Sequence, residues 1–153
     1  MTHQEDYNLS SSTIEDLTRN GLEAVPELVK VLLNSVMQAE RAKHLQAAEY
    51  ERTEDRKGHA NGYKPKTVRT RLGEITFAIP QVREGGFYPS ALEKGMRSER
   101  ALVIALAEMY VQGVSTRKVK AITEELCGIE ISAMQVSRAA TQLDGVLQEW
   151  RER

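Results

Sequence analysis

The chain has 153 residues, of which 41% are apolar and 28% are charged, and its formal net charge is −1. This balance of apolar and charged residues excludes a disordered polymer. A membrane protein is also excluded, because the longest apolar run, 101–107, is far shorter than the roughly 20 residues of a membrane span. Residues 1–16 are polar and acidic and do not form a signal-peptide pattern, so we expect a cytoplasmic protein. The single cysteine, Cys127, cannot form an internal disulfide, and we expect it to be a small core residue.

Acidic and basic residues are separated along the chain. Residues 1–51 carry four basic and nine acidic side chains, a net charge of −5. Residues 56–71 carry six basic side chains and no acidic one, a net charge of +6. A basic stretch of this density favours a polyanionic partner, with a solvated surface as the alternative.

Two helices are predicted in residues 1–51. Ser12 and Glu15 form a capping-box pattern that opens a short helix, which Asn20-Gly21 would close. Pro26 suits the first turn of a longer helix that extends to about Tyr50. Its apolar residues recur at helical spacing and pack either on the rest of the chain or on a second copy. They are Val25, Leu28, Val29, Leu32, Leu33 and Val36.

Residues 52–89 predict a basic β-hairpin. Two runs rich in β-branched residues, 67–71 and 75–79, flank Gly73, which we place at the turn. Because strand side chains alternate, Lys66, Val68 and Thr70 would share one face, and Thr67, Arg69 and Arg71 the other. Pro80 would end the hairpin, and a loop through Gly85-Gly86 and Pro89 would follow it.

Residues 98–153 predict three helices separated by short turns. Ser98 can cap a helix that Gly113 ends, and Ser115 can cap a second helix that ends near Cys127-Gly128. Ser132 and Gln135 form a capping box for the third helix. We therefore expect a mainly α fold with a small β-hairpin, of the α+β class. Its parts would be an N-terminal helical segment (1–51), a basic β-hairpin module (52–89) and a trihelical helix-turn-helix domain (90–153).

The runs Gly113–Val119 and Ser132–Arg138 resemble the helix-turn-helix units of DNA-binding recombinases, so we expect the second and third helices to bind double-stranded DNA. In such a unit the later helix enters the major groove and the earlier one crosses the backbone. Gln135 and Arg138 carry groups that pair with adenine and guanine. The alternative is a bundle helix that binds no nucleic acid. The complete set of predicted DNA contacts is Lys64, Lys66, Arg69, Arg71, Arg117, Lys118, Lys120, Ser132, Gln135, Ser137 and Arg138.

A resemblance to a known family extends from about residue 20 to the end of the chain, and a series of short motifs between residues 58 and 138 carries it. The series comprises Gly58–Tyr63, Thr70–Gly73, Ile79-Pro80, Arg83, Gly86-Phe87, Arg97-Ser98, Tyr110–Arg117, Ile122–Gly128 and Val136–Arg138. In this order the motifs resemble the N-terminal half of Mutator-type bacterial insertion-sequence transposases. Gln81 departs from the pattern, because that family usually has a basic residue after the proline, and this puts a single DNA contact in doubt.

The resemblance implies a protein that binds the inverted repeats at the ends of a mobile element and catalyses strand cleavage and joining. It also implies that the chemistry belongs to a ribonuclease-H-like domain beyond this chain, where three carboxylates hold two divalent metal ions such as Mg²⁺. We therefore expect no catalysis by this chain alone, and no cofactor or metal site in it. Asp144 matches no catalytic motif, and His3, His44 and His59 lack metal-ligand spacing. We expect no membrane partner and no small-molecule substrate.

The last helix carries an apolar seam to its final turn, formed by Val136, Ala140, Leu143, Leu147 and Trp150. The seam is consistent with a truncated chain, and it could also form a dimer contact, so we expect a homo-oligomer. Two other interpretations stay open. One is a stand-alone helix-turn-helix transcriptional regulator that dimerises through residues 25–36, and the other is a remnant that binds nothing strongly.

Overall fold

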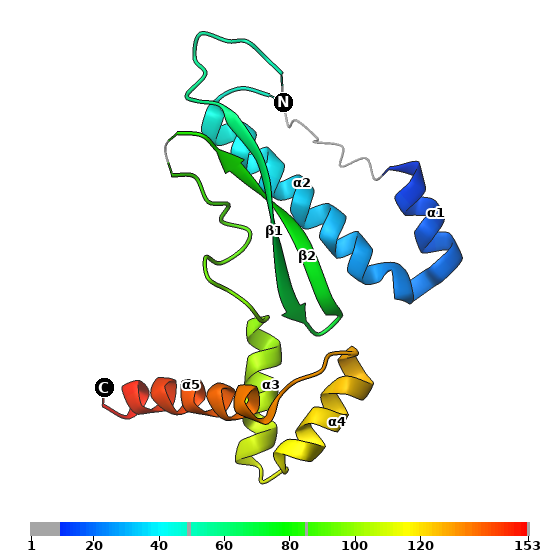
Figure 1. Cartoon of the computed structure of the whole chain (residues 1–153), viewed down its shortest axis with the longest axis vertical. Coiled ribbons are helices and arrows are strands. Elements are labelled where there is room, and N and C mark those ends of the chain that lie inside the picture. The colour runs from blue at the N-terminus through cyan, green and yellow to red at the C-terminus, as the bar shows by residue number, and fades with distance from the viewer. Residues whose placement is uncertain (1–9, 49, 85, 153) are drawn as a thin grey trace, which may run out of the picture.

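The computed structural model describes residues 10–48, 50–84 and 86–152, and it has the expected α+β fold (Figure 1). Two helices precede a two-stranded antiparallel hairpin, and three helices follow it. Within the described part of the chain, no helix is long and apolar enough to cross a membrane. In chain order the elements are α1 (Ser11–Asn20), a short 3-10 helix (Gly21–Ala24), α2 (Val25–Leu45), β1 (Ala60–Thr70), β2 (Gly73–Val82), α3 (Arg100–Val111), α4 (Thr116–Cys127) and α5 (Ala133–Arg151).

The first two helices begin and end on local signals. Ser10, not Ser12, caps α1, because its hydroxyl accepts a hydrogen bond from the Thr13 backbone N–H. Gly21 ends α1 as predicted, with a φ of 56°. Pro26 lies in the first turn of α2, but α2 stops at Leu45, short of the predicted end near Tyr50. The reason is Gln46, which adopts a left-handed conformation and closes the helix through its backbone N–H.

The hairpin is longer than the sequence pattern predicts. The two strands are joined by a turn at Arg71-Leu72, and Gly73 begins β2 opposite Thr70 with a φ of 106°. The expectation that Pro80 ends the hairpin is wrong, since β2 continues to Val82 and Pro80 pairs with Tyr63. In a sheet of two strands, both strands are edges, so a proline can sit where its missing N–H is not needed.

One face of the hairpin packs on α2, which runs along it in Figure 1. Val29 and Leu33 of the predicted apolar stripe contact this core, whereas Leu32 and Val36 stay partly exposed. Asn34 also accepts a hydrogen bond from the Ala78 backbone N–H at 3.0 Å. Part of the stripe is therefore used within the chain. The buried core residues are Met37, Val68, Ile75, Phe77, Ile79 and Leu92.

The three C-terminal helices form a second core beyond the hairpin turn (Figure 1). Glu99, not Ser98, is the N-cap of α3, because the Ser98 backbone forms a parallel bridge with Arg69 of β1. Gly113 has a positive φ just after α3, and Gly128 closes α4, both as predicted. Cys127 packs against this core as a half-buried residue, as expected. The buried core residues are Leu102, Leu106, Ala107, Val119, Ile129, Ile131, Val136 and Ala139.

The predicted seam on α5 is partly used inside this bundle. Val136 and Ala140 are buried, and Leu143 packs against the core that α5 shares with α3. The side chains of Leu147 and Trp150 lie outside the described residues. The first half of the seam therefore serves the fold of this chain, and the oligomer stays a prediction.

Candidate nucleic-acid interface

The starts of α4 and α5 are fixed by their own caps. The Ser115 hydroxyl accepts a hydrogen bond from the Lys118 backbone N–H. At α5 the capping box is complete, since the Ser132 hydroxyl accepts from the Gln135 N–H at 3.3 Å and the Gln135 side chain accepts from the Ser132 N–H at 2.8 Å. Ile129 and Ile131 of the intervening turn are buried. Together these contacts hold the two helix N-termini in a defined orientation.

The polar residues predicted to contact DNA from these helices are mostly exposed. Ser132, Ser137 and Arg138 are exposed at the start of α5, and Gln135 between them is half-buried. Arg117 and Lys118 are exposed in the first turn of α4, and neither forms an ion pair with a described residue. Their charges are therefore available to an anionic partner.

Lys120 differs from the other two basic residues of α4. Its ammonium Nζ lies 2.6 Å from Oε1 of Glu130, in the turn that leads to α5. The hydrogen bond with Glu130 raises the pKa of Lys120, and the same contact lowers the pKa of Glu130. Glu130 therefore competes with any phosphate that approaches Lys120.

The basic residues of the hairpin do not form one free face. Lys64 is exposed, but the Lys66 ammonium donates to the Tyr88 hydroxyl at 2.8 Å and to the Glu93 carbonyl at 3.0 Å. Arg69 pairs with Glu74 across the hairpin at 2.9 Å. Arg71 pairs with Glu99, the N-cap of α3, also at 2.9 Å. Three of these four basic residues, Lys66, Arg69 and Arg71, therefore form contacts within the chain.

A basic groove of about 720 Å³ brings residues of the hairpin and of α5 together. Arg69 of β1 lines it on one side, and Gln135 and Arg138 of α5 line it on another. These are three of the predicted DNA contacts. The groove adds three basic residues that the sequence interpretation missed, namely Lys94, Arg97 and Arg100. We call this set of six residues the basic groove.

Lys94 and Arg97 lie between the predicted loop and the predicted helix, where the sequence pattern assigns no element, and the structure attaches this segment to the hairpin. The Arg69 backbone N–H donates to the Arg97 carbonyl at 3.0 Å, and the Glu99 N–H donates to the Arg69 carbonyl at 2.6 Å. The repeat of a basic residue every three positions, at 94, 97 and 100, is a signal that could have indicated this surface. Its position beside α5 depends on the pairing with Arg69, which no local pattern predicts.

No group of three or more His, Cys, Asp or Glu side chains is placed to hold a metal ion in residues 10–48, 50–84 and 86–152. The described residues therefore offer no fit for the metal ions that the resemblance implies. We derive no catalytic step from this chain.

Comparison with known proteins agrees with the resemblance in the sequence. The family model described as "Transposase, Mutator family" matches residues 1–153. The chain is 56% identical over 139 residues to the transposase for insertion sequence element IS406 of Burkholderia multivorans, covering 90% of this chain and 36% of that protein. It is 44% identical over 144 residues to the transposase for ISRM5 of Rhizobium meliloti, covering 94% of this chain and 36% of that protein.

A third relative extends the match over nearly the whole chain. The transposase for IS256 in transposon Tn4001 of Staphylococcus aureus is 38% identical over 152 residues, which cover 98% of this chain and 39% of that protein. The chain thus spans somewhat more than a third of the length of these curated relatives. The full-length family match and these relatives together show that the chain belongs to the Mutator family of transposases.

Proposed function

We propose that this chain is the DNA-recognition part of a transposase and binds the terminal inverted repeats of an insertion sequence. The observation that carries the proposal is the basic groove, which is lined by Gln135 together with five basic residues, namely Arg69, Lys94, Arg97, Arg100 and Arg138. Glu93 is the one acidic residue among the described residues that line it. Clustered basic side chains of this kind neutralise phosphates, and a neighbouring amide can read a base edge.

In this proposal α4 and α5 act as a helix-turn-helix. The first two turns of α5 enter the major groove, where Gln135, Ser137 and Arg138 face base edges. Arg117 and Lys118, in the first turn of α4, contact the phosphate backbone and position the unit. The capping box supports this assignment, because it orients the start of α5 without using the Arg138 side chain.

The hairpin and the residues that follow it contact the DNA backbone beside α5. Arg69 and Arg97 lie on neighbouring segments that are joined by backbone hydrogen bonds, and both line the groove, where the Arg69 guanidinium is shared with its ion-pair partner Glu74. Arg71 is held by Glu99 and contributes through the fold more than through a phosphate contact. Of the hairpin residues, Lys64 is exposed and is the other candidate for a direct contact.

Strand cleavage and joining belongs, in the same proposal, to a longer protein. The chain spans only 36% to 39% of the three relatives described above. Metal ions of the kind the family uses would be held by carboxylates outside residues 1–153. In this proposal, two copies of the longer protein hold the two ends of the insertion element. Light scattering tests this oligomer, and a monomer mass that does not change with concentration would contradict it.

A gel-shift experiment tests the proposed function. A duplex taken from the end of the insertion element is compared with a scrambled duplex of the same composition across a salt series. Arg138→Ala should reduce the preference for the end duplex, because a base contact is worth about 1–3 kcal/mol of discrimination. Lys118→Ala is the matched control and should weaken binding to both duplexes equally while flattening the salt dependence. Equal binding of the unchanged chain to the two duplexes contradicts the proposal.

A further inference from the structure

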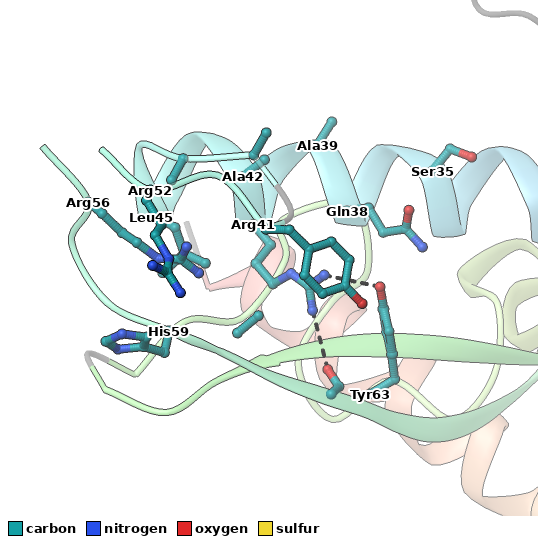
Figure 2. A pocket seen from close by; sticks show the side chains of 15 residues that line it. Ser35, Gln38, Ala39, Arg41, Ala42, Leu45, Arg52, Arg56, His59 and Tyr63 are labelled. Atoms are coloured by element: carbon teal, nitrogen blue, oxygen red, sulfur yellow. Dashed lines mark hydrogen bonds between the residues drawn. The ribbon is translucent and has the colours of Figure 1, made fainter. Parts of the chain in front are cut away.

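A second pocket lies at the other end of the hairpin, between the C-terminal half of α2 and the start of β1 (Figure 2). It has a volume of about 980 Å³. Arg41, Arg52, Arg56 and His59 line it together with Tyr63, and no aspartate or glutamate is among its described lining residues. The described lining therefore favours an anionic ligand over a cationic one.

Arg41 is the central residue of this pocket. It is only 5% exposed, and its guanidinium donates to the Gly62 carbonyl at 3.3 Å and to the Tyr63 hydroxyl at 3.0 Å, as Figure 2 shows. The guanidinium also lies over the Tyr63 ring, 4.8 Å from its centre. These partners are all neutral, and no ion pair joins Arg41 to a carboxylate of the described residues. A buried charge without a counter-ion is costly, so an anion bound here would compensate it.

Two further arginines bring positive charge to the same pocket. Arg56 is oriented by backbone carbonyls, because its Nε donates to the Gly58 carbonyl at 2.8 Å and its Nη1 donates to the Glu51 carbonyl at 2.6 Å. Arg52 is exposed and makes no hydrogen bond with the described residues. Arginine presents a planar fork of donors that matches the oxygens of a phosphate group. Several guanidinium groups around one hollow are typical of a phosphate site.

We infer that this pocket binds a phosphate group of the DNA backbone, at a second contact separate from the basic groove. The inference rests on the proposed function. Between Ala60, which lines this pocket, and Arg69, which lines the basic groove, β1 rises by ~30 Å at about 3.3 Å per residue. This length is close to the ~34 Å helical repeat of B-DNA. In this inference, a duplex that follows the hairpin meets one basic site near each end, about one turn apart.

The test measures binding of the full chain to the element-end duplex as a function of salt. Arg52→Ala removes a pocket charge without breaking any hydrogen bond among described residues, so the fold should be retained. Loss of one phosphate contact should weaken binding about threefold to tenfold and reduce the slope of log K against log salt by about 0.9. Preference for the end duplex over a scrambled one should not change, because a phosphate contact carries no sequence information.

Lys43→Ala is the matched control, since Lys43 is exposed on the same end of α2 but does not line the pocket. It should change affinity less than twofold. Arg41→Lys keeps the buried charge and loses the fork of donors, so it should weaken binding as Arg52→Ala does, with circular dichroism confirming that the variant is folded. If Arg41→Lys does not fold, Arg52→Ala alone decides.

The outcomes separate this inference from the proposed function. If the unchanged chain binds the end duplex specifically and Arg52→Ala behaves like Lys43→Ala, the phosphate pocket is overturned and the proposed function stands. Inorganic pyrophosphate could stabilise the chain against heat while Arg52→Ala leaves the affinity for the duplex unchanged. In that case the pocket binds a free phosphate, and its assignment to the DNA backbone is overturned. If the unchanged chain shows no preference for the end duplex, the proposed function falls, and this inference falls with it.

Discussion

The Nζ of Lys120 on α4 lies 2.6 Å from Oε1 of Glu130, in the turn before α5. Both side chains are at the surface, so the pair is exposed to solvent and salt. An exposed pair of this kind adds little to stability, yet it occupies one of the three basic residues near the start of α4. Glu130 thus competes with DNA phosphates for Lys120.

Glu130→Gln should therefore raise the affinity for the element-end duplex. The substitution removes the competing charge and frees Lys120 for a phosphate, so the slope of log K against log salt should steepen by about 0.9. Thermal unfolding should change little, because the pair is exposed. Glu124→Gln, an exposed change on the same helix without a hydrogen bond to Lys120, should have the smaller effect on affinity. If the two variants raise the affinity equally, the effect comes from the change in net charge, and the proposed competition between Glu130 and DNA phosphates is wrong.

The same pair predicts a pH dependence. Contact with Lys120 lowers the pKa of Glu130 in the folded state, so the stabilisation by the pair is present above the ordinary carboxyl pKa and is lost as pH falls through the lowered value. Contact with Glu130 raises the pKa of Lys120, so the stabilisation is present below the ordinary lysine pKa and is lost as pH rises through the raised value. At neutral pH the pair is intact. The affinity difference between the unchanged chain and Glu130→Gln should be largest there and should disappear in acid, as a fluorescence anisotropy titration would show.

Gln135 has two roles, and one substitution separates them. Its side-chain oxygen accepts the Ser132 N–H in the capping box, while its amide nitrogen is the group proposed to meet a base. Gln135→Glu keeps an acceptor for the cap and removes the donor, so urea unfolding should change by less than about 1 kcal/mol while preference for the end duplex is lost. Ser115→Ala, which removes the N-cap of α4 and is not among the predicted DNA contacts, is the opposite control. It should cost about 1 kcal/mol of stability and spare the preference. Preference retained by Gln135→Glu would remove this residue from the reading face.

Local signals account for the parts of the fold that the sequence predicted. Three helix ends form from contacts between residues only a few positions apart, so the local sequence is enough to predict them. They are the Ser115 cap, the Ser132-Gln135 capping box and the turn at Gly128. Ser98 has the same chemistry as Ser115 but is not an N-cap. Its backbone pairs with Arg69 instead, and a partner so distant in sequence leaves no trace in a local pattern.

The candidate site was predicted less completely, for the same physical reason. The basic groove needs Arg97 and Arg138 on either side of one hollow, and that arrangement follows from tertiary packing. Lys120 and Glu130 meet across a turn, so helical spacing does not reveal the pair. Composition indicated which charges could bind a polyanion. Only the fold determines which of them are already paired.

The orientation of α5 should depend on the core beneath it. Leu106 on α3 is buried in the core that also contains Val136 and Ala139 of α5. Leu106→Ala should lower the free energy of unfolding by about 2–5 kcal/mol, because it removes buried surface and leaves a cavity. Ile104→Ala is the matched control on the same helix, where the side chain is 49% exposed, and should cost less than half as much. Urea unfolding followed by circular dichroism makes the comparison, and equal costs would contradict the assigned core.

Two glycines should respond in opposite directions to alanine. Gly145 lies inside α5 without a positive φ, and among the described residues no side chain comes within 4 Å of the position of a new Cβ. Gly145→Ala should stabilise the chain by roughly 0.5–1 kcal/mol, because alanine loses less backbone entropy on entering a helix. Gly73 has a φ of 106°, and a Cβ there would lie 3.5 Å from the Cys127 carbonyl oxygen, at the contact between the hairpin turn and α4. Gly73→Ala should therefore destabilise the chain by about 1–3 kcal/mol. Thermal and urea unfolding of the two variants gives the signs directly, and a neutral Gly73→Ala would mean that this backbone conformation is not required for the hairpin to meet the helices.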